Sequence, residues 1–275
     1  MGRKGPVATG APIRIVKLGG SVITQKSAAR ATLREDVLAR LAKEVAASQG
    51  ETVVLHGAGS FGHPGAKKYG LKGGLKAEGA LHGAAEVRAS VSKLNAAVCE
   101  ALAAAGAAPW PFPPSSVAMM RDGNLRRVDW EVFDAALGRG FMPVSFGDVV
   151  LDELLGVSIL SADDIAQALA RHLHPVTVVF AVDTEGVYDR DPKAPGAQLI
   201  QRLKAGEKRP ISAGAGGADD VTGGMAAKVA AAQAIAFGGA RVLIVNGLKA
   251  GRVKAALAGQ EVVGTEIVPP GVVAR

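Results

Sequence analysis

The stretch Ile13-Arg14-Ile15-Val16-Lys17-Leu18-Gly19-Gly20-Ser21 decides the fold that we expect for this chain. The apolar run from Ile13 to Val16 predicts a buried strand. The Gly-Gly-Ser that follows predicts an exit loop with uncovered backbone N–H groups, because glycine lets the chain turn and lets an anion approach closely. Such a loop suits a phosphate group. Taken alone, paired glycines after a strand also fit a simple tight turn, so other residues have to decide.

The composition describes a globular protein with a full hydrophobic core. Of the 275 residues, 48% are hydrophobic and 21% are charged, which excludes a disordered chain. The single cysteine, Cys99, excludes an internal disulfide and favours a reducing compartment. No stretch approaches the about 20 consecutive apolar residues of a membrane span, and the N-terminus lacks the apolar core of a secretion signal. We therefore expect a cytoplasmic protein with no membrane partner.

The formal net charge of +7 favours an anionic partner. Lysines and arginines are scattered through the expected helices, however, and no aromatic residues interleave with a basic stripe as they do on nucleic-acid surfaces. We therefore expect no nucleic-acid partner and assign the charge to small anionic ligands and to solubility.

The pattern after Ser21 predicts a strand, a helix and a second strand. Val22 to Lys26 is expected to form a short hairpin arm, and Thr32 and Glu35 have the spacing of a capping box at the start of an amphipathic helix. Thr52 to Leu55 predicts a buried strand that runs into a second glycine loop, His56 to His63. Such a unit is a right-handed crossover in a parallel sheet, so both glycine loops face one site at the carboxyl ends of the strands. Two phosphate groups held there have the arrangement that a phosphoryl donor and acceptor need.

The remaining pattern alternates helices and strands, and it predicts a three-layer αβα sandwich with a mainly parallel central sheet. Helices are expected at 79–105, 130–137, 165–172, 225–237 and 251–257, strands at 142–146, 176–182, 241–245 and 262–268, and hairpins at 115–128 and 149–159. Residues 1–12 are expected to be a flexible tail and residues 13–275 a single domain. Within it, an acceptor-binding lobe spans about residues 13–174 and a nucleotide-binding lobe about residues 175–275.

Three lysines stand out as candidate phosphate ligands: Lys17, Lys26 and Lys228. Lys228 follows Thr222 to Met225, a glycine-rich helix start that leaves N–H groups free for an anion. Three ammonium groups around two polyphosphates would form the charge-spreading clamp of phosphoryl transfer. The alternative reading is that Lys26 and Lys228 are ordinary surface residues.

Together these motifs resemble the isopentenyl phosphate kinases of the amino acid kinase superfamily, over about residues 13–247. The matching stretches are Lys17 to Thr24, His56 to Pro64, Lys67 to Gly70, Pro114 to Ser116, Gly147 to Val150, Asp183 to Tyr188, and Asp220 to Met225 with Lys228. The resemblance implies the amino acid kinase fold and ATP-dependent phosphorylation of isopentenyl phosphate to isopentenyl diphosphate in an alternative mevalonate route. It also implies Mg²⁺ that rides on ATP without a dedicated protein site, and a homodimer.

The resemblance also implies the site residues. Around ATP it places Lys17, Gly19, Gly20, Ser21, Lys26, Gly59, Asp183, Tyr188, Gly224 and Lys228. Around the acceptor phosphate it places Gly57, Ala58, His63, Ser161 and Ala162. The catalytic set is Lys17, Lys26, His63 and Lys228, whereas His56 is expected to be structural. The alternative for His63 is an exposed or helix-capping histidine.

Four positions depart from the family pattern. Where the family has Gly-Gly-Gly, the chain has Gly57-Ala58-Gly59, and where it has Asp-Val-Asp-Gly, the chain has Asp183-Thr184-Glu185-Gly186. Gln25 replaces the Asp of the family's Thr-Asp-Lys, and Ala162 replaces the Gly of its Ser-Gly-Asp-Asp. Ala58 and Ala162 each add a methyl group beside the acceptor phosphate, and neither change removes a charge.

The acceptor oxygen of such a reaction is already ionised near neutral pH, so no general base is required. Asp163 and Asp183 are candidate orienting groups, and Asp163 is alternatively a helix cap. The helix around His82 to Leu94, with Met119 and Ile159, is expected to wall an apolar slot for the prenyl tail, although core packing explains these residues equally well. The rival functions are a fosfomycin-type kinase on the same fold and a non-catalytic nucleotide- or nucleic-acid-binding protein.

Overall fold

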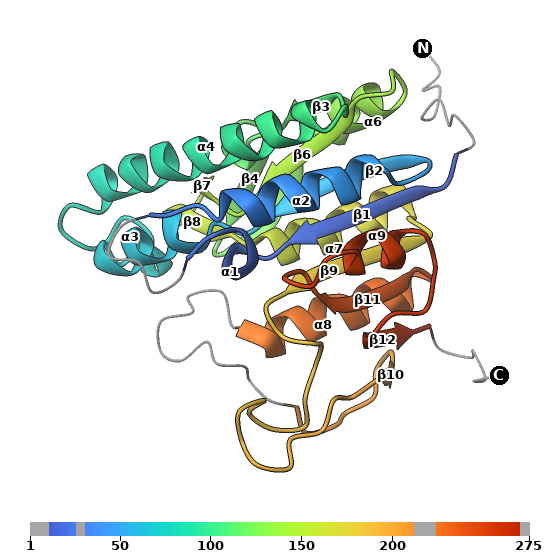
Figure 1. Cartoon of the computed structure of the whole chain (residues 1–275). Helices are drawn as coiled ribbons and strands as arrows, with labels where there is room; N and C mark the ends of the chain where they lie inside the picture. Colours follow the sequence, from blue (N-terminus) through green and yellow to red (C-terminus); the bar gives the residue numbers. More distant parts are fainter. Residues whose placement is uncertain (1–10, 26–30, 212–223, 270–275) are drawn as a thin grey trace.

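The computed structural model describes residues 11–25, 31–211 and 224–269. An eight-stranded sheet runs through it in the order β10-β12-β11-β9-β1-β2-β6-β3 (Figure 1). Its strands are β1 (Ile13–Leu18), β2 (Glu51–His56), β3 (Pro109–Pro111), β6 (Met142–Phe146), β9 (Thr177–Val182), β10 (Arg202–Lys204), β11 (Arg241–Asn246) and β12 (Gly264–Val268). All neighbouring strands are parallel except β11 and β12. The predicted, mainly parallel sheet is therefore confirmed.

Consecutive residues of the central strands point to opposite faces of the sheet, which produces two separate hydrophobic cores. Ile15 and Phe180 pack in a core with α6, α7 and α8, whereas Val16 and Val179 pack in a core with α2, α4 and α9. The helices that cover the two faces are α2 (Glu35–Ala46), α4 (Ala80–Ala104), α6 (Trp130–Leu137), α7 (Ala162–Leu173), α8 (Gly224–Phe237) and α9 (Arg252–Leu257). This is the predicted three-layer αβα sandwich.

A second sheet, in the order β5-β4-β7-β8, flanks the first. Its strands are β4 (Ala118–Arg121), β5 (Asn124–Val128), β7 (Asp148–Asp152) and β8 (Gly156–Leu160). They form the two predicted hairpins, which are joined by a parallel contact between β4 and β7. The prediction was wrong for residues 115–117, which belong to the short helix α5 (Pro114–Val117), and the second hairpin begins one residue before its predicted start, at Asp148.

The segment after the first glycine loop also differs from the prediction. Gly20 to Ile23 form the helical turn α1, and Thr24 then pairs with Leu33 in an isolated antiparallel bridge, so residues 22–25 do not form a hairpin arm. Lys26 lies outside the described residues. The capping box is also wrong, because Arg34 is the N-cap of α2 and makes no side-chain capping bond.

Glycines extend the ladder of the sheet at the carboxyl ends of its central strands. Gly19 donates its N–H to Ala181, Gly57 to Leu18, Gly147 to His56 and Gly247 to Val182. A residue without a side chain therefore follows β1, β2, β6 and β11, which leaves room above the sheet. The short helix η1 (Gly59–Phe61) lies within the second glycine loop, and α3 (His63–Lys68) and η2 (Leu71–Gly73) come directly after it. No helix in the described part of the chain is both long and apolar enough to cross a membrane.

Candidate active site

A cavity of about 1040 Å³ opens above the carboxyl ends of the central strands. Both glycine loops line it, as the crossover between β1 and β2 predicted. Of the predicted site residues, it brings together Lys17, Gly19, Gly20, Ser21, Gly57, Ala58, Gly59, His63, Ser161, Ala162, Asp183, Gly224 and Lys228. Tyr188 does not line the cavity: it is half-buried and pairs with Leu199. Lys26 and residues 220–223 lie outside the described residues, so their predicted places stay predictions.

The two glycine loops touch through their backbones. A Cβ atom on Gly20 would lie 2.4 Å from the amide nitrogen of Gly59, and one on Gly57 would lie 2.7 Å from the amide nitrogen of Gly20. Both distances are shorter than any side chain tolerates, so glycine is required here for the close approach. The loops therefore form one continuous surface in which N–H groups of both can face a ligand.

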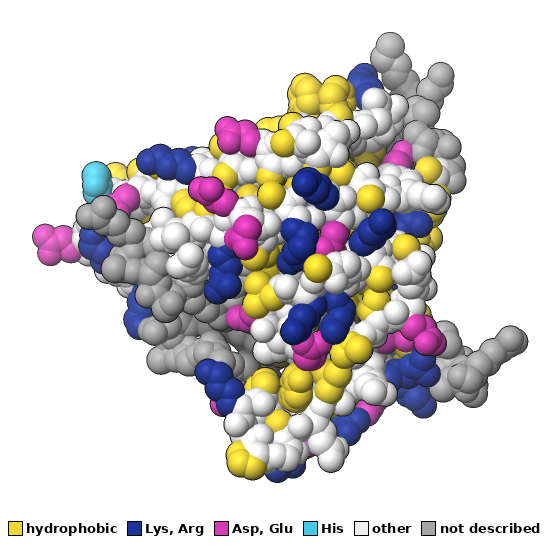
Figure 2. All heavy atoms as spheres, in the orientation of Figure 1, with side chains coloured by type: hydrophobic (Ala, Val, Ile, Leu, Met, Phe, Trp, Pro, Cys, Tyr) yellow, Lys and Arg dark blue, Asp and Glu magenta, His cyan; other side chains and the backbone are white. Residues whose placement is uncertain are grey.

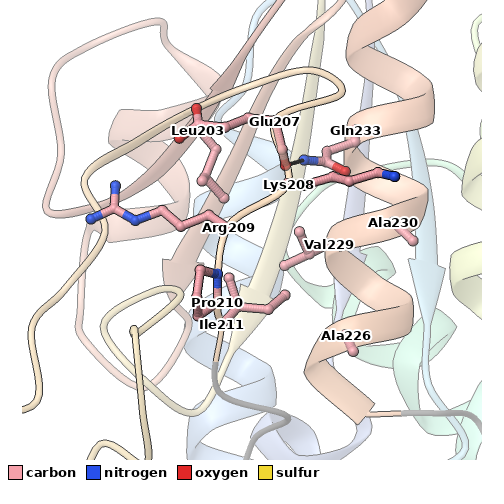
Figure 3. A pocket seen from close by; sticks show the side chains of 10 residues that line it. All are labelled: Leu203, Glu207, Lys208, Arg209, Pro210, Ile211, Ala226, Val229, Ala230 and Gln233. Carbon is pink, nitrogen blue, oxygen red and sulfur yellow. Dashed lines mark hydrogen bonds between the residues drawn. The ribbon is translucent and has the colours of Figure 1, made fainter.

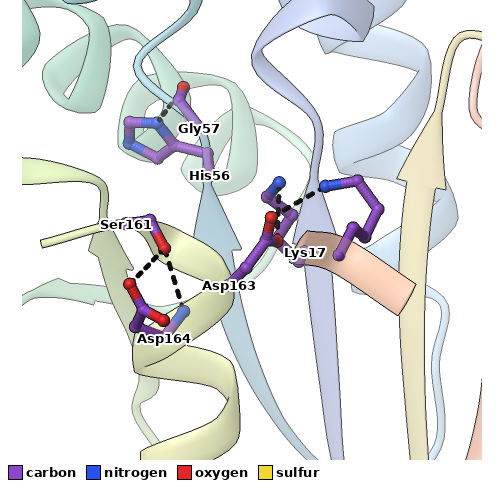
Figure 4. Close-up of polar contacts among 7 residues, drawn as sticks. Lys17, His56, Gly57, Ser161, Asp163 and Asp164 are labelled. Carbon is purple, nitrogen blue, oxygen red and sulfur yellow. Dashed lines mark hydrogen bonds and ion pairs between the residues drawn. The ribbon is translucent and has the colours of Figure 1, made fainter. Parts of the chain in front are cut away.

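Asp163 lies between two lysine ammonium groups that line the cavity with it. Its Oδ1 is 2.8 Å from Lys17 Nζ, and its Oδ2 is 2.8 Å from Lys228 Nζ. Figure 4 shows the side chain of Asp163, from α7, directed at Lys17 on β1. The three residues come from three elements that are distant in sequence, so the sequence named Asp163 as a candidate orienting group but could not show that it bridges Lys17 and Lys228.

Burial sets the charges of this cluster. It lowers the pKa of Lys17 to about 8, with help from the positive charge of Lys228 and against the attraction of Asp163. Burial alone would raise the pKa of Asp163, but the charges of Lys17 and Lys228 outweigh it and hold that pKa well below its usual range. Near neutral pH the cluster therefore carries one net positive charge beside an open cavity, which favours an anionic ligand.

The structure also decides which residue caps α7. Ser161 is the N-cap, and its Oγ accepts a hydrogen bond from the backbone N–H of Asp164 at 3.1 Å. Asp163 is thereby left to face the lysines, so of the two predicted roles the structure favours the orienting one. The helix predicted at 165–172 is present, and it begins three residues earlier, at Ala162.

The two histidines of the second loop differ in environment. His56 is fully buried, its Nε2 lies 3.2 Å from Asn95 Oδ1, and its ring stacks on that of Phe146. Burial lowers the pKa of His56 to about 4. It is neutral at physiological pH and supports the end of β2, as expected for a structural residue. His63 starts α3 and lines the cavity, where it can reach a ligand.

One end of the cavity is apolar. Ala66, Val87, Val91, Val149 and Ile159 line it, from α3, α4, β7 and β8. The prediction that α4 and Ile159 form a wall is thus supported by Val87 and Val91. Its other members do not line the cavity: Leu94 is fully buried in the core, His82 is exposed and Met119 packs within the second sheet.

Sequence analysis assigned no role to three lysines at the rim. Lys67 and Lys68 line the cavity from α3, the helix that His63 starts, and Lys193 lines it from the loop after β9. The first two lie in a stretch that carried the family resemblance, and Lys193 follows Asp191-Pro192 in the loop after β9. Three further positive side chains therefore line the same cavity as the central cluster.

The described residues contain no group of three or more His, Cys, Asp or Glu side chains placed to hold a metal ion. A smaller hollow of about 430 Å³ lies between α8 and the segment after β10 (Figure 3). Leu203 and Val229 line it, and the guanidinium group of Arg209 points away from the other labelled side chains. It contains none of the predicted site residues.

The surface does not display a basic stripe on the face seen in Figure 2. Lysine and arginine side chains are interspersed there with aspartates and glutamates. This face therefore lacks the continuous positive potential of a typical nucleic-acid surface.

Comparison with known proteins identifies the family. The model of the amino acid kinase family matches residues 12–246. The chain is 36% identical to the isopentenyl phosphate kinase of Methanothermobacter thermautotrophicus, over 92% of this chain and 98% of that protein. A structure described as "X-ray structures of isopentenyl phosphate kinase" superposes with a TM-score of 0.81 at 34% identity and covers 93% of this chain and 100% of its own. The product complex of the Thermoplasma acidophilum isopentenyl phosphate kinase gives a TM-score of 0.78 at 30% identity, with 93% and 99% covered. The chain belongs to the amino acid kinase family.

Proposed function

We propose that this protein transfers the γ-phosphoryl group of ATP to isopentenyl phosphate, producing isopentenyl diphosphate and ADP. The observation that carries the proposal is the Lys17–Asp163–Lys228 cluster, which stands where two touching glycine loops meet a cavity with one apolar end. The similarity over nearly the whole chain to proteins named isopentenyl phosphate kinase supports the same reaction.

In the proposed mechanism, an ionised oxygen of the acceptor phosphate attacks the γ-phosphorus in line. The new P–O bond forms as the bond from the γ-phosphorus to the bridging β-phosphate oxygen breaks, and ADP leaves with that oxygen. No general base is needed, because the attacking oxygen carries no proton to remove. Lys17 and Lys228 neutralise the charge on the transferred group, and N–H groups of the glycine loops add fixed dipoles.

The proposal divides the cavity between two substrates. Lys17, Gly19, Gly20, Ser21, Gly59, Asp183, Gly224 and Lys228 surround the nucleotide, and Gly57, Ala58, His63, Ser161 and Ala162 surround the acceptor phosphate. The acceptor-binding lobe is then about residues 13–174 and the nucleotide-binding lobe about residues 175–275. Tyr188 and Lys26 keep their proposed places near ATP, Tyr188 through the loop after β9.

Mg²⁺ is proposed to enter with ATP, bound mainly through phosphate oxygens and water, which suits its preference for few protein ligands. The donor set fits this arrangement, since Asp183 lines the cavity with a carboxylate and the described residues contain no group of three or more such ligands. When bound, the ion would supply further neutralisation of the phosphate charge. We also propose a cytoplasmic homodimer that acts in an alternative mevalonate route to isoprenoids.

The apolar end of the cavity favours a prenyl acceptor over the small polar substrate of a fosfomycin-type kinase. Val87, Val91 and Ile159 present aliphatic surface beside the proposed acceptor phosphate site, and burying a methylene group on such surface is worth about 0.8 kcal/mol. A prenyl tail gains from this contact, whereas a small polar molecule does not. A non-catalytic nucleotide- or nucleic-acid-binding role does not explain why the Lys17–Asp163–Lys228 cluster lies beside two glycine loops that each suit a phosphate group.

Release of ADP, coupled to a spectroscopic assay, tests the proposal with isopentenyl phosphate, dimethylallyl phosphate, fosfomycin and no acceptor side by side. We expect turnover with the first two that exceeds the acceptor-free rate at least tenfold, and the Lys228→Met variant serves as the matched inactive control. Turnover with fosfomycin but with neither prenyl phosphate would show that the protein is a fosfomycin-type kinase instead. Absence of turnover with every acceptor would refute a kinase function for these substrates.

A further inference from the structure

We propose that Thr24, which touches neither substrate, is a positioning residue that fixes the distance between the phosphate donor loop and the acceptor loop. The inference rests on the proposed function. Thr24 is fully buried and does not line the cavity, so its effect has to pass through the loops that do.

The hydroxyl group of Thr24 bonds to both loops at once. Its Oγ1 donates to the carbonyl oxygen of Gly20 at 2.7 Å and accepts from the backbone N–H of Ser60 at 3.0 Å. Gly20 belongs to the loop after β1, and Ser60 to the loop after β2. A single side-chain oxygen therefore links the loop assigned to the donor with the loop assigned to the acceptor.

The atoms around the Thr24 hydroxyl group are closely packed. A Cβ atom on Gly59 would lie 2.2 Å from Thr24 Oγ1, and Gly59 has a φ of +51°, so glycine is needed there for two reasons. The backbone N–H of Thr24 also donates to the Gly20 carbonyl oxygen at 2.9 Å. The hydroxyl group is thus closely packed between the two loops, and its removal leaves the part-buried N–H of Ser60 without this acceptor.

The spacing of the loops matters because both substrates bind through them. In-line transfer requires the attacking oxygen to lie about 3 to 3.5 Å from the γ-phosphorus and in line with the breaking bond, and a misplacement of about 1 Å can cost on the order of 100-fold in rate. Each loop on its own still binds its phosphate after a small shift. We therefore expect loss of Thr24 to lower kcat while both KM values change little.

Two substitutions separate the hydroxyl group from the shape of the side chain. Thr24→Val keeps the shape and removes the hydroxyl group, whereas Thr24→Ser keeps the hydroxyl group and removes a methyl group. Thr52→Val is the matched control, because Thr52 is also a buried threonine, 3% exposed, whose hydroxyl group lies 2.8 Å from Ser48 Oγ at the opposite end of β2. It removes a comparable hydrogen bond away from the cavity.

Steady-state kinetics with ATP and isopentenyl phosphate give the test. We expect Thr24→Val to lower kcat by about 10- to 100-fold with KM values within about threefold of the wild type, and Thr24→Ser and Thr52→Val to stay within about threefold in kcat. Wild-type kcat in folded Thr24→Val would overturn the proposal, as would an equal loss in Thr52→Val or a loss confined to KM.

A binding measurement gives a second readout that a merely structural role would not move. A compound that joins adenosine and an isopentenyl group through four phosphates spans both loops, so its affinity should fall at least tenfold in the variant while ATP affinity stays unchanged. Equal losses for both ligands would overturn the proposal. If Thr24→Val does not fold, Thr24→Ala takes its place under the same criteria. An inactive wild type would refute the proposed function, whereas an active wild type with an unimpaired variant would refute only the role of Thr24.

Discussion

Asp152 and Asp163 are both buried aspartates with a lowered pKa, but they are held by different kinds of partner. Asp152 accepts hydrogen bonds from four backbone N–H groups, two in the turn between β4 and β5 and two in its own turn, and from Ser158 Oγ at 2.7 Å. Asp163 contacts two lysine side chains at the edge of a cavity.

The difference separates a structural carboxylate from one that serves ligand binding. Backbone donors cannot leave Asp152 without unfolding a turn, so its hydrogen bonds stabilise the second sheet. The ammonium groups around Asp163 end flexible side chains, and they can turn toward phosphate while the carboxylate keeps them near one another. A buried acidic residue therefore indicates function here through the mobility of its partners and the cavity beside it.

The largest expected effect follows from breaking the lysine cluster. Lys228→Met removes one ammonium group from the transferred phosphate, and loss of such a group costs about 3 to 4 kcal/mol of barrier, or roughly 100- to 1000-fold in kcat. Asp163 keeps Lys17 as a partner, so the fold should persist. Product formation and a thermal melt of the same sample check both statements, and turnover within threefold of the wild type would contradict the role.

Breaking the Asp152 network should instead cost stability. Asp152→Ala leaves four backbone N–H groups without their acceptor and should lower the free energy of unfolding by about 3 kcal/mol. Urea denaturation measures this loss. Glu153→Ala is the matched control, because its exposed ion pair with Arg121 is worth at most about 1 kcal/mol. A loss no larger than that of the control would show that Asp152 is not the link between the hairpins.

The pH dependence of activity sharpens the same contrast. Because burial lowers the pKa of Lys17 to about 8, its ammonium charge is present below that pH and lost above it. We expect kcat/KM for ATP to fall about tenfold per pH unit on the alkaline side. Lys17→Arg cannot lose its charge, so its profile should lack this limb even if its rate is lower. If kcat/KM falls in the same way at alkaline pH in the wild type and in Lys17→Arg, the titrating group is not Lys17.

The smallest expected effect concerns acid stability. The folded-state pKa of Asp152 lies below its unfolded value of 3.8, so the carboxylate stabilises the fold above that value and loses this effect as the pH falls through the folded-state pKa. Asn at this position cannot be protonated. The difference in unfolding free energy between the wild type and Asp152→Asn should therefore shrink from about pH 5 to about pH 2, and a constant difference would contradict the assignment.

Most of the fold could be predicted from local patterns. The helix at 130–137 and the strand at 142–146 have the predicted bounds, because apolar spacing and flanking glycines mark both. The short β10 and α3 were missed, since three to six residues carry little periodicity. Residues 22–25 were misjudged because their conformation depends on the contact between Thr24 and the second glycine loop, which lies over 30 residues away.

The candidate site could be predicted in part for the same reason. The glycine loops and Lys228 stand in recognisable motifs, but for Asp163 an orienting role and a helix cap both stayed open, because sequence spacing cannot show that Lys17 and Lys228 lie 2.8 Å from it. Thr24 belongs to a stretch that carries the family resemblance, but the sequence assigned it no role. Its two partners are backbone groups, which no side-chain motif records.

Phosphorus NMR of the wild type with ATP and isopentenyl phosphate tests the central claim most directly. The account predicts that ADP and a prenyl diphosphate appear in equal amounts, with two coupled phosphorus signals for the new diphosphate, and that Lys228→Met forms neither at a comparable rate. ADP accompanied only by inorganic phosphate, or an unchanged isopentenyl phosphate signal while ATP is consumed, would contradict it.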